Sequence, residues 1–98
     1  MATYLMTFNY TQQGIQKIKE SPRRVEAAKK TIQSLGGEVK VFYGIIGAEY
    51  DTIFIMEAPD DEAVGKMALA ISAQGSVRTS THRVFSEEEF KRIISGLP

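Results

Sequence analysis

The segment Tyr50 to Ala58 constrains the fold of this 98-residue chain more than any other segment. Residues 53–56 read Ile-Phe-Ile-Met, so both faces of an extended segment are apolar there. A strand that buries both faces belongs in the middle of a sheet, with material packed above and below it. We therefore expect a sheet with this segment at its centre, within one domain that spans residues 1–98.

The rest of the chain predicts further strands and helices around this segment. Alternating apolar residues, or runs of β-branched and aromatic residues, predict four strands in all: Thr3–Tyr10, Glu38–Ile46, Tyr50–Ala58 and Val77–Phe85. Apolar residues at spacings of three and four predict helices after Thr11 (with a break at Pro22), after Pro59 and after Ser86. The order βαββαβ with an extra C-terminal helix predicts an α+β, ferredoxin-like fold with an antiparallel sheet.

The second face of this sheet is expected to be buried by another part of the protein or by another subunit. A ferredoxin-like fold places its two main helices on one face of the sheet. Because the central segment is apolar on both faces, a lone chain would expose an apolar patch on the other face, which monomers usually avoid. We expect a homo-oligomer, a dimer or higher, in which the sheets of two subunits pack together.

Composition excludes several classes of partner. The 12 basic and 12 acidic residues cancel, so the chain has no net field to attract nucleic acid or an anionic membrane. Its longest apolar stretch, Val41 to Ala48, is far shorter than the roughly 20 residues of a membrane span. The N-terminus lacks a secretion-signal pattern, so we expect a cytoplasmic protein. Cysteine is absent, which excludes disulfides, thiolate nucleophiles and thiolate metal ligands.

Asp51 is the first candidate for chemistry because it leads into the central strand. An unpaired carboxylate there would be costly, and Arg78 and Arg24 are its expected cationic partners. In a functional interpretation, Asp51 is a general base or ligand anchor and Tyr50 donates a hydrogen bond. In the plainer interpretation, which we favour, the two residues lock a hairpin or contact another subunit.

His82 is the second candidate, because an imidazole titrates near neutral pH. A single histidine without cysteines does not make a usual zinc site, so we expect no metal and no cofactor. The acidic runs at residues 60–62 and 87–89 begin helices, where capping explains them; Ser86 and Glu89 form a capping box. The basic residues between 17 and 30 are interpreted as a solvated helix face.

Several segments together resemble the GYD domain family over nearly the entire chain. They are Gln13-Gly14-Ile15, Ser21-Pro22 with Arg24, Gly36-Gly37, Tyr50-Asp51, the run from Glu57 to Ala63, and Val77-Arg78-Thr79 with Thr81 and Phe85. The resemblance implies a dimeric α+β barrel, a fold shared with small oxygenases, decarboxylating and dechlorinating enzymes, and ligand-sensing modules. It implies no particular activity, because fold alone does not assign chemistry.

The chain departs from the family pattern at two places. The family glycine stands one residue before Tyr-Asp, whereas Ala48 and Glu49 here separate Gly47 from Tyr50, so the hairpin is expected to be one residue longer. The position of His82 is apolar in the family, which argues against a family-wide catalytic role for it.

Three functions remain open from these observations. The first is an oligomeric protein that binds a small-molecule ligand in a cavity between sheets. The second is a cofactor-independent oxygenase or isomerase that uses Asp51 or His82 for proton transfer. The third is a purely structural assembly unit with a cavity filled by side chains. The candidate ligand-binding residues are Asn9, Arg24, Tyr43, Tyr50, Asp51, Arg78 and His82.

Overall fold

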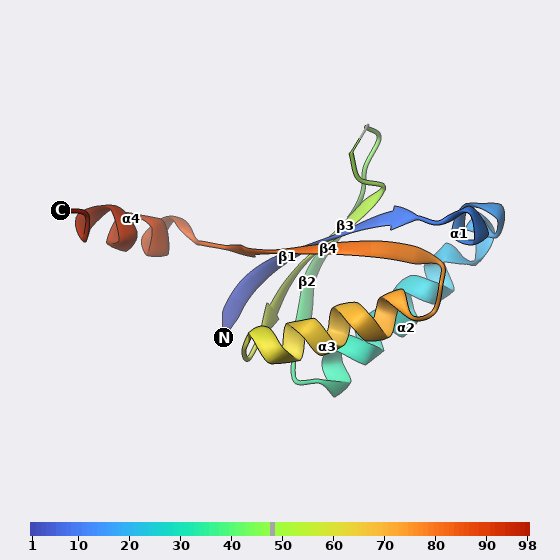
Figure 1. The fold of residues 1–98 in the computed structure, drawn as a ribbon, viewed down its shortest axis with the longest axis horizontal. Helices are drawn as coiled ribbons and strands as arrows, with labels where there is room; N and C mark the ends of the chain where they lie inside the picture. The colour runs from blue at the N-terminus through green and yellow to red at the C-terminus, as the bar shows by residue number, and fades with distance from the viewer. Residues whose placement is uncertain (48) are drawn as a thin grey trace.

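The computed structural model of the chain describes residues 1–47 and 49–98 (Figure 1). The strands are β1 (Ala2–Tyr10), β2 (Glu38–Gly44), β3 (Thr52–Ala58) and β4 (Val77–Val84). The helices are α1 (Gln12–Gln16), the 3₁₀ helix η1 (Ile18–Glu20), α2 (Ser21–Ser34), α3 (Asp61–Ser72) and α4 (Glu87–Ser95). The strands form one antiparallel sheet in the order β2-β3-β1-β4, which confirms the predicted ferredoxin-like α+β fold.

The central position of β3 is confirmed. It pairs with β1 on one side and β2 on the other, and its residues alternate between buried and half-buried. β4 lies at the sheet edge, as its polar sequence indicates.

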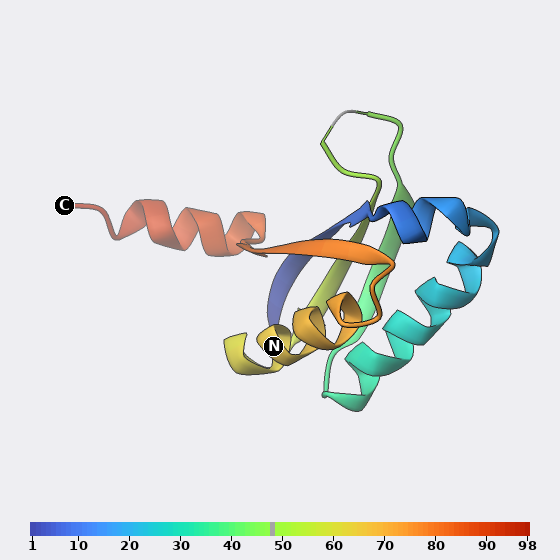
Figure 2. The ribbon, with the colours of Figure 1, turned by 45° about the vertical axis from the view of Figure 1, so that its right-hand side comes forward.

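Helices α2 and α3 cover one face of the sheet, as Figures 1 and 2 show. On this face the side chains of Phe8 and Phe54 meet edge to face, with ring centroids 5.0 Å apart. At the other end of β1, the Tyr4 hydroxyl donates a 2.5 Å hydrogen bond to Asp61 at the start of α3. This bond, together with burial, raises the pKa of Tyr4. The core residues are Tyr4, Met6, Phe8, Ile32, Phe54, Met56, Ala58, Val64, Met67 and Ile71.

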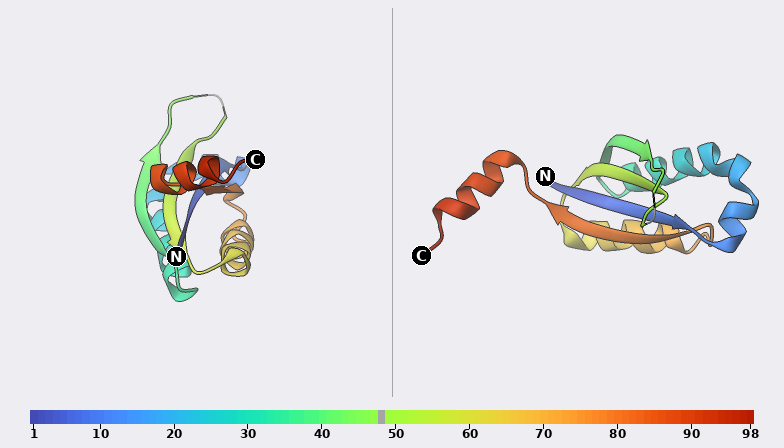
Figure 3. Two further views of the ribbon diagram at one scale, coloured as in Figure 1. Left: turned by 90° about the vertical axis from the view of Figure 1, so that its left-hand side faces the viewer. Right: turned by 90° about the horizontal axis from the view of Figure 1, so that it is seen from above.

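The opposite face of the sheet carries apolar side chains that no helix covers in the described ranges 1–47 and 49–98; we call it the open face. Leu5 and Ile55 lie side by side on it and are half-buried, and Tyr43 of β2 is 60% exposed. The loop between β2 and β3 rises on this side (Figures 1 and 3). An open apolar face therefore exists in one chain, while the second subunit expected to cover it stays a prediction.

Helix α4 projects beyond the end of the sheet, away from α2 and α3 (Figures 1 and 3), and the long axis of the molecule reaches 51 Å. The predicted capping box is confirmed: the Glu89 amide donates to the Ser86 hydroxyl at 3.1 Å, and the Ser86 amide donates to the Glu89 carboxylate at 2.9 Å. Among the helices of the described residues, none is long and apolar enough to cross a bilayer.

Several predicted boundaries were wrong. Pro22 does not break a helix; it lies in the first turn of α2, where its missing N–H costs nothing, and the chain turns earlier, at Lys17. β2 ends at Gly44 and β3 begins at Thr52, so the predicted strands, which reached Ile46 and began at Tyr50, were too long. The expected extra hairpin residue concerns Ala48, which lies outside the described residues.

Candidate functional site

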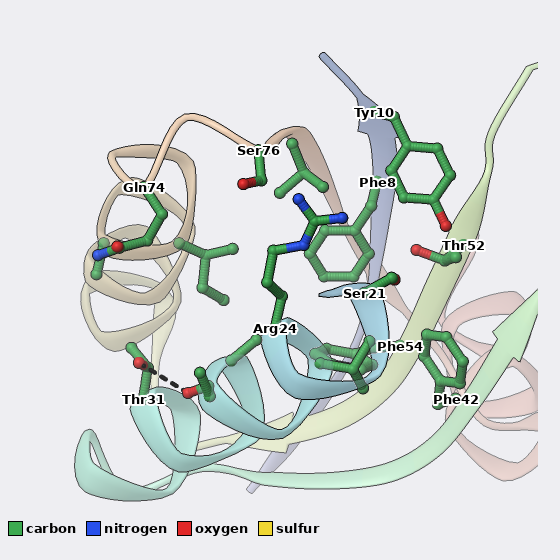
Figure 4. Close-up of a pocket in the computed structure, with 16 residues that line it drawn as sticks. Phe8, Tyr10, Ser21, Arg24, Thr31, Phe42, Thr52, Phe54, Gln74 and Ser76 are labelled. Atoms are coloured by element: carbon green, nitrogen blue, oxygen red, sulfur yellow. Dashed lines mark hydrogen bonds between the residues drawn. The ribbon is translucent and has the colours of Figure 1, made fainter. Parts of the chain in front are cut away.

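A cavity of about 330 Å³ lies between α2, α3 and the helix-covered face of the sheet (Figure 4). It lies at one end of the sheet. Antiparallel pairing of β1 with β3 and β4 brings lining residues together there, with Phe8 opposite Thr52 and Tyr10 opposite Val77. The lining residues are Phe8, Tyr10, Ser21, Arg24, Val25, Ala27, Ala28, Thr31, Phe42, Thr52, Phe54, Ala70, Ile71, Gln74, Ser76 and Val77.

Small side chains on α2 account for this cavity. Ser21, Ala28 and Thr31 line it from the helix, opposite the rings of Phe8 and Phe54 on the sheet. Protein interiors are normally filled to the density of organic crystals, and side chains as short as these do not reach across to the rings. The short side chains on this helix face therefore contribute to the space, which Arg24 and Val25 also line from α2.

The Arg24 side chain extends from α2 among the side chains that line the cavity (Figure 4). Its Nη2 donates to the carbonyl oxygens of Gly14 at 3.1 Å and Lys17 at 3.3 Å. The guanidinium is half-buried, and no carboxylate in the described part of the chain forms a salt bridge with it. A cationic group with unused donors thus faces an otherwise largely apolar space.

A close contact between Gly14 of α1 and the backbone of Ser76 fixes the segment that supplies the carbonyl partners of Arg24. A Cβ at Gly14 would lie 1.9 Å from the carbonyl oxygen of Ser76, so only glycine allows α1 to approach the turn before β4. The Thr11 hydroxyl caps α1 by accepting from the Gly14 amide at 3.0 Å and donates to Gly75 at 2.7 Å. α1 is thereby fixed beside the cavity.

Thr52 contributes a second polar group. The residue is only 8% exposed, and its hydroxyl has no hydrogen-bond partner within residues 1–47 and 49–98. Figure 4 shows the hydroxyl groups of Thr52 and Tyr10 on the same side of the cavity. The Thr52 hydroxyl therefore has unused hydrogen-bonding capacity toward the cavity.

In the structure, Asp51 forms hydrogen bonds with the backbone of β1. Its carboxylate accepts from the Tyr10 amide at 2.8 Å, and its own amide donates to Phe8 at 2.9 Å. The expected ion pairs with Arg78 and Arg24 are wrong: neither arginine forms a salt bridge with Asp51 in the described residues, and the carboxylate pairs instead with an amide of β1. Tyr50 precedes Asp51 in the loop and is half-buried.

Four other predicted residues lie on the open face, away from the cavity. Asn9 stands opposite Arg78, and its amide donates to the Glu49 carbonyl at 2.7 Å. His82 is exposed on β4, with its Nε2 3.3 Å from the Ser80 hydroxyl, and Tyr43 lies at the far side of the sheet on β2. The described residues contain no cluster of His, Asp and Glu able to hold a metal ion.

The seven predicted residues therefore separate into three groups, of which Tyr50 and Asp51, between β2 and β3, form one. Arg24 alone lines the cavity; Asn9, Tyr43, Arg78 and His82 share the open face, where an enclosed space would need a second chain. The aromatic and small residues around the cavity were missed. The signal that could have indicated the cavity is the group of short side chains on α2, Ser21, Ala28 and Thr31.

Comparison with known proteins identifies the family. The GYD domain matches residues 4–94. The chain belongs to the GYD domain family. A curated relative from Thermus thermophilus, the glutamine synthetase and cystathionine beta-lyase binding protein, is 27% identical over 82 residues, which covers 83% of this GYD-domain chain and 85% of the relative.

Two solved structures share the fold. TTHA0845 from Thermus thermophilus is 23% identical, with a TM-score of 0.56 over 88% of this GYD-domain chain and 95% of the other. A 5-chloro-2-hydroxyhydroquinone dehydrochlorinase from Burkholderia phenoliruptrix, in complex with 2,5-dihydroxybenzoquinone, is 14% identical, with a TM-score of 0.60 over 88% and 96% of the two chains. At these identities the likeness concerns the fold.

Proposed function

We propose that this GYD-domain protein binds a small organic molecule in the cavity between α2, α3 and the sheet. The observation that carries the proposal is the cavity itself: about 330 Å³ of space with largely apolar walls and a few convergent polar groups. This volume lies at the lower end of the range of ligand pockets, which fits a molecule of about one ring. Arg24 and Thr52 supply polar anchors at its wall.

The lining favours binding over acid–base catalysis. No carboxylate or imidazole belongs to the lining that the described residues form. Asp51 is engaged by the Tyr10 amide, and His82 is exposed on the open face. A proton-transfer enzyme needs such a group within reach of its substrate, so the proposed role is binding.

A second candidate function is docking to protein partners, including further copies of this chain. It is favoured by apolar side chains that one chain leaves exposed, both on the open face and on α4, where Phe90 is 54% and Ile94 49% exposed. The Thermus thermophilus relative is named for binding two enzymes, which agrees with this kind of role. A homo-oligomer that covers the open face, acting as a structural unit, belongs to the same proposal.

The ligand proposal is tested by filling the cavity. Ala28 lines it, so Ala28→Leu places a larger side chain in the space. A collection of single-ring compounds is added to ¹⁵N-labelled protein, and amide shifts at α2 and the start of β3 are recorded. We expect compounds that shift these signals in the native protein to lose their effect in Ala28→Leu.

The matched control is Ala73→Leu, at an exposed position outside the cavity, where binding is retained. If no compound shifts the cavity signals, or if Ala28→Leu binds as well as the native protein, the cavity is not a ligand site.

A further inference from the structure

We infer that the cavity takes a hydroxylated single-ring aromatic acid, with its carboxylate on Arg24 and its ring packed against the aromatic side chains of the sheet. This inference rests on the proposed function, because it names the ligand class of the same site. Three features carry it: the unpaired cation, the aromatic wall and the unpaired hydroxyl.

The cation selects an anionic group. Both hydrogen bonds that the Arg24 guanidinium donates to described residues come from Nη2, so the donors on Nε and Nη1 are left for a ligand. Its partners are carbonyl groups, which do not neutralise the charge. A partly buried guanidinium is stabilised most by a carboxylate, which matches two of its donors at once.

The aromatic wall selects a ring. Phe54 stands edge to face with Phe8 at 5.0 Å and with Phe42 at 5.8 Å between ring centroids. These three rings line the cavity together, and a flat aromatic ligand continues their packing through further edge and offset contacts. An aliphatic acid of the same volume lacks those contacts.

Thr52 selects a hydroxyl on that ring. Its side chain is nine-tenths buried and has no partner for its hydroxyl among the described residues, while Tyr10 presents a second hydroxyl beside it (Figure 4). A ring hydroxyl both donates and accepts, so it satisfies either group. Because the described lining holds no acidic side chain, an amine ligand finds no counter-charge there.

The experiment compares acids with amides of the same shape. The ortho, meta and para isomers of hydroxybenzoate, and the corresponding hydroxybenzamides, are titrated into the native protein by calorimetry and by NMR. We expect at least one acid to bind with an affinity about tenfold or more above that of its amide, because a hydrogen bond to a charged group is stronger than a neutral one.

Arg24→Gln removes the charge and keeps a shorter, neutral hydrogen-bond donor at this position. We expect it to reduce acid binding about tenfold and to leave amide binding nearly unchanged. Arg23→Gln is the matched control: Arg23 is the adjacent arginine, but its side chain is 79% exposed and pairs with Glu20, so acid binding is retained.

The outcomes separate the inference from the proposed function. Equal affinity of acid and amide for the native protein, which needs no variant to fold, overturns the inference. It is also overturned if the hydroxybenzoates do not bind while other compounds shift the cavity signals, and in both cases the cavity remains a ligand site. If no compound of any class shifts those signals, the proposed function fails as well.

Discussion

Asp51 shows how one side chain fixes the end of a strand. Its carboxylate pairs with the Tyr10 amide, and its backbone amide pairs with Phe8, so it ties the β2–β3 loop to β1 through both groups. A buried amide without this acceptor would lose its partner. The plainer interpretation of Asp51, a hairpin lock, agrees with this geometry.

We predict that Asp51→Ala lowers the free energy of unfolding by about 1–2 kcal/mol, because it removes a charge-assisted hydrogen bond at a half-buried site. Asp51→Asn keeps an acceptor oxygen and is expected to cost less. Urea denaturation measures both, with the exposed Glu26→Ala as control. If Asp51→Asn abolished ligand binding at unchanged stability, Asp51 would instead belong to a site.

At the scale of elements, α4 is held by its first turn more than by packing. The capping box and the 2.9 Å ion pair between Arg83 and Glu89 tie its start to β4, while Phe90, Ile93, Ile94 and Leu97 remain exposed. The hydrogen bond from the Ser86 backbone amide and, as a smaller cause, the hydrogen bond from the Arg83 side chain lower the pKa of Glu89 to about 2. An isolated helix of this length is marginal in water, so its cap matters.

We predict that α4 loses helicity in acid. A carboxylate whose folded pKa is lowered stabilises the folded form above its unfolded pKa, near 4.5, and this contribution is lost as the pH falls to about 2. Carbon chemical shifts of residues 90–94 report the change. Glu89→Gln keeps a capping box without the charge, so its α4 signals should change less over this pH range. Identical titrations of the two proteins would contradict the prediction.

At the scale of the whole molecule, the apolar surface is divided between two faces of the sheet. The helices bury one face, and the other keeps Leu5 and Ile55 half-buried. Together with the exposed side of α4, this leaves apolar groups that a second copy would cover.

We predict that the native protein has a mass at least twice the 10.9 kDa of one chain in light-scattering measurements at micromolar concentration. Ile55→Lys places a charge on the open face and should yield monomers, because a charge is costly to bury in an interface. Leu69→Lys makes the same kind of change at an exposed position of α3 and should leave the mass unchanged. A monomeric native protein would contradict the prediction.

Much of the fold was predictable because it depends on local patterns. Apolar alternation predicted the strand whose Tyr4, Met6 and Phe8 lie on the buried face, and the run at residues 53–56 predicted β3 at the centre of the sheet. The capping box at Ser86 was readable because its partners are three residues apart. Strand ends were less accurate, since Asp51 bonds to a residue of β1 that is distant in the chain.

The candidate site was predictable only in part. Arg24 was named from the family pattern, but its place in a cavity depends on α2 crossing the ends of β1 and β3. Whether Ser21, Ala28 and Thr31 leave space depends on which rings they face, and those rings come from strands far apart in the chain. Periodicity sets which face of an element is apolar, whereas cavities and unpaired polar groups arise where faces from distant segments meet.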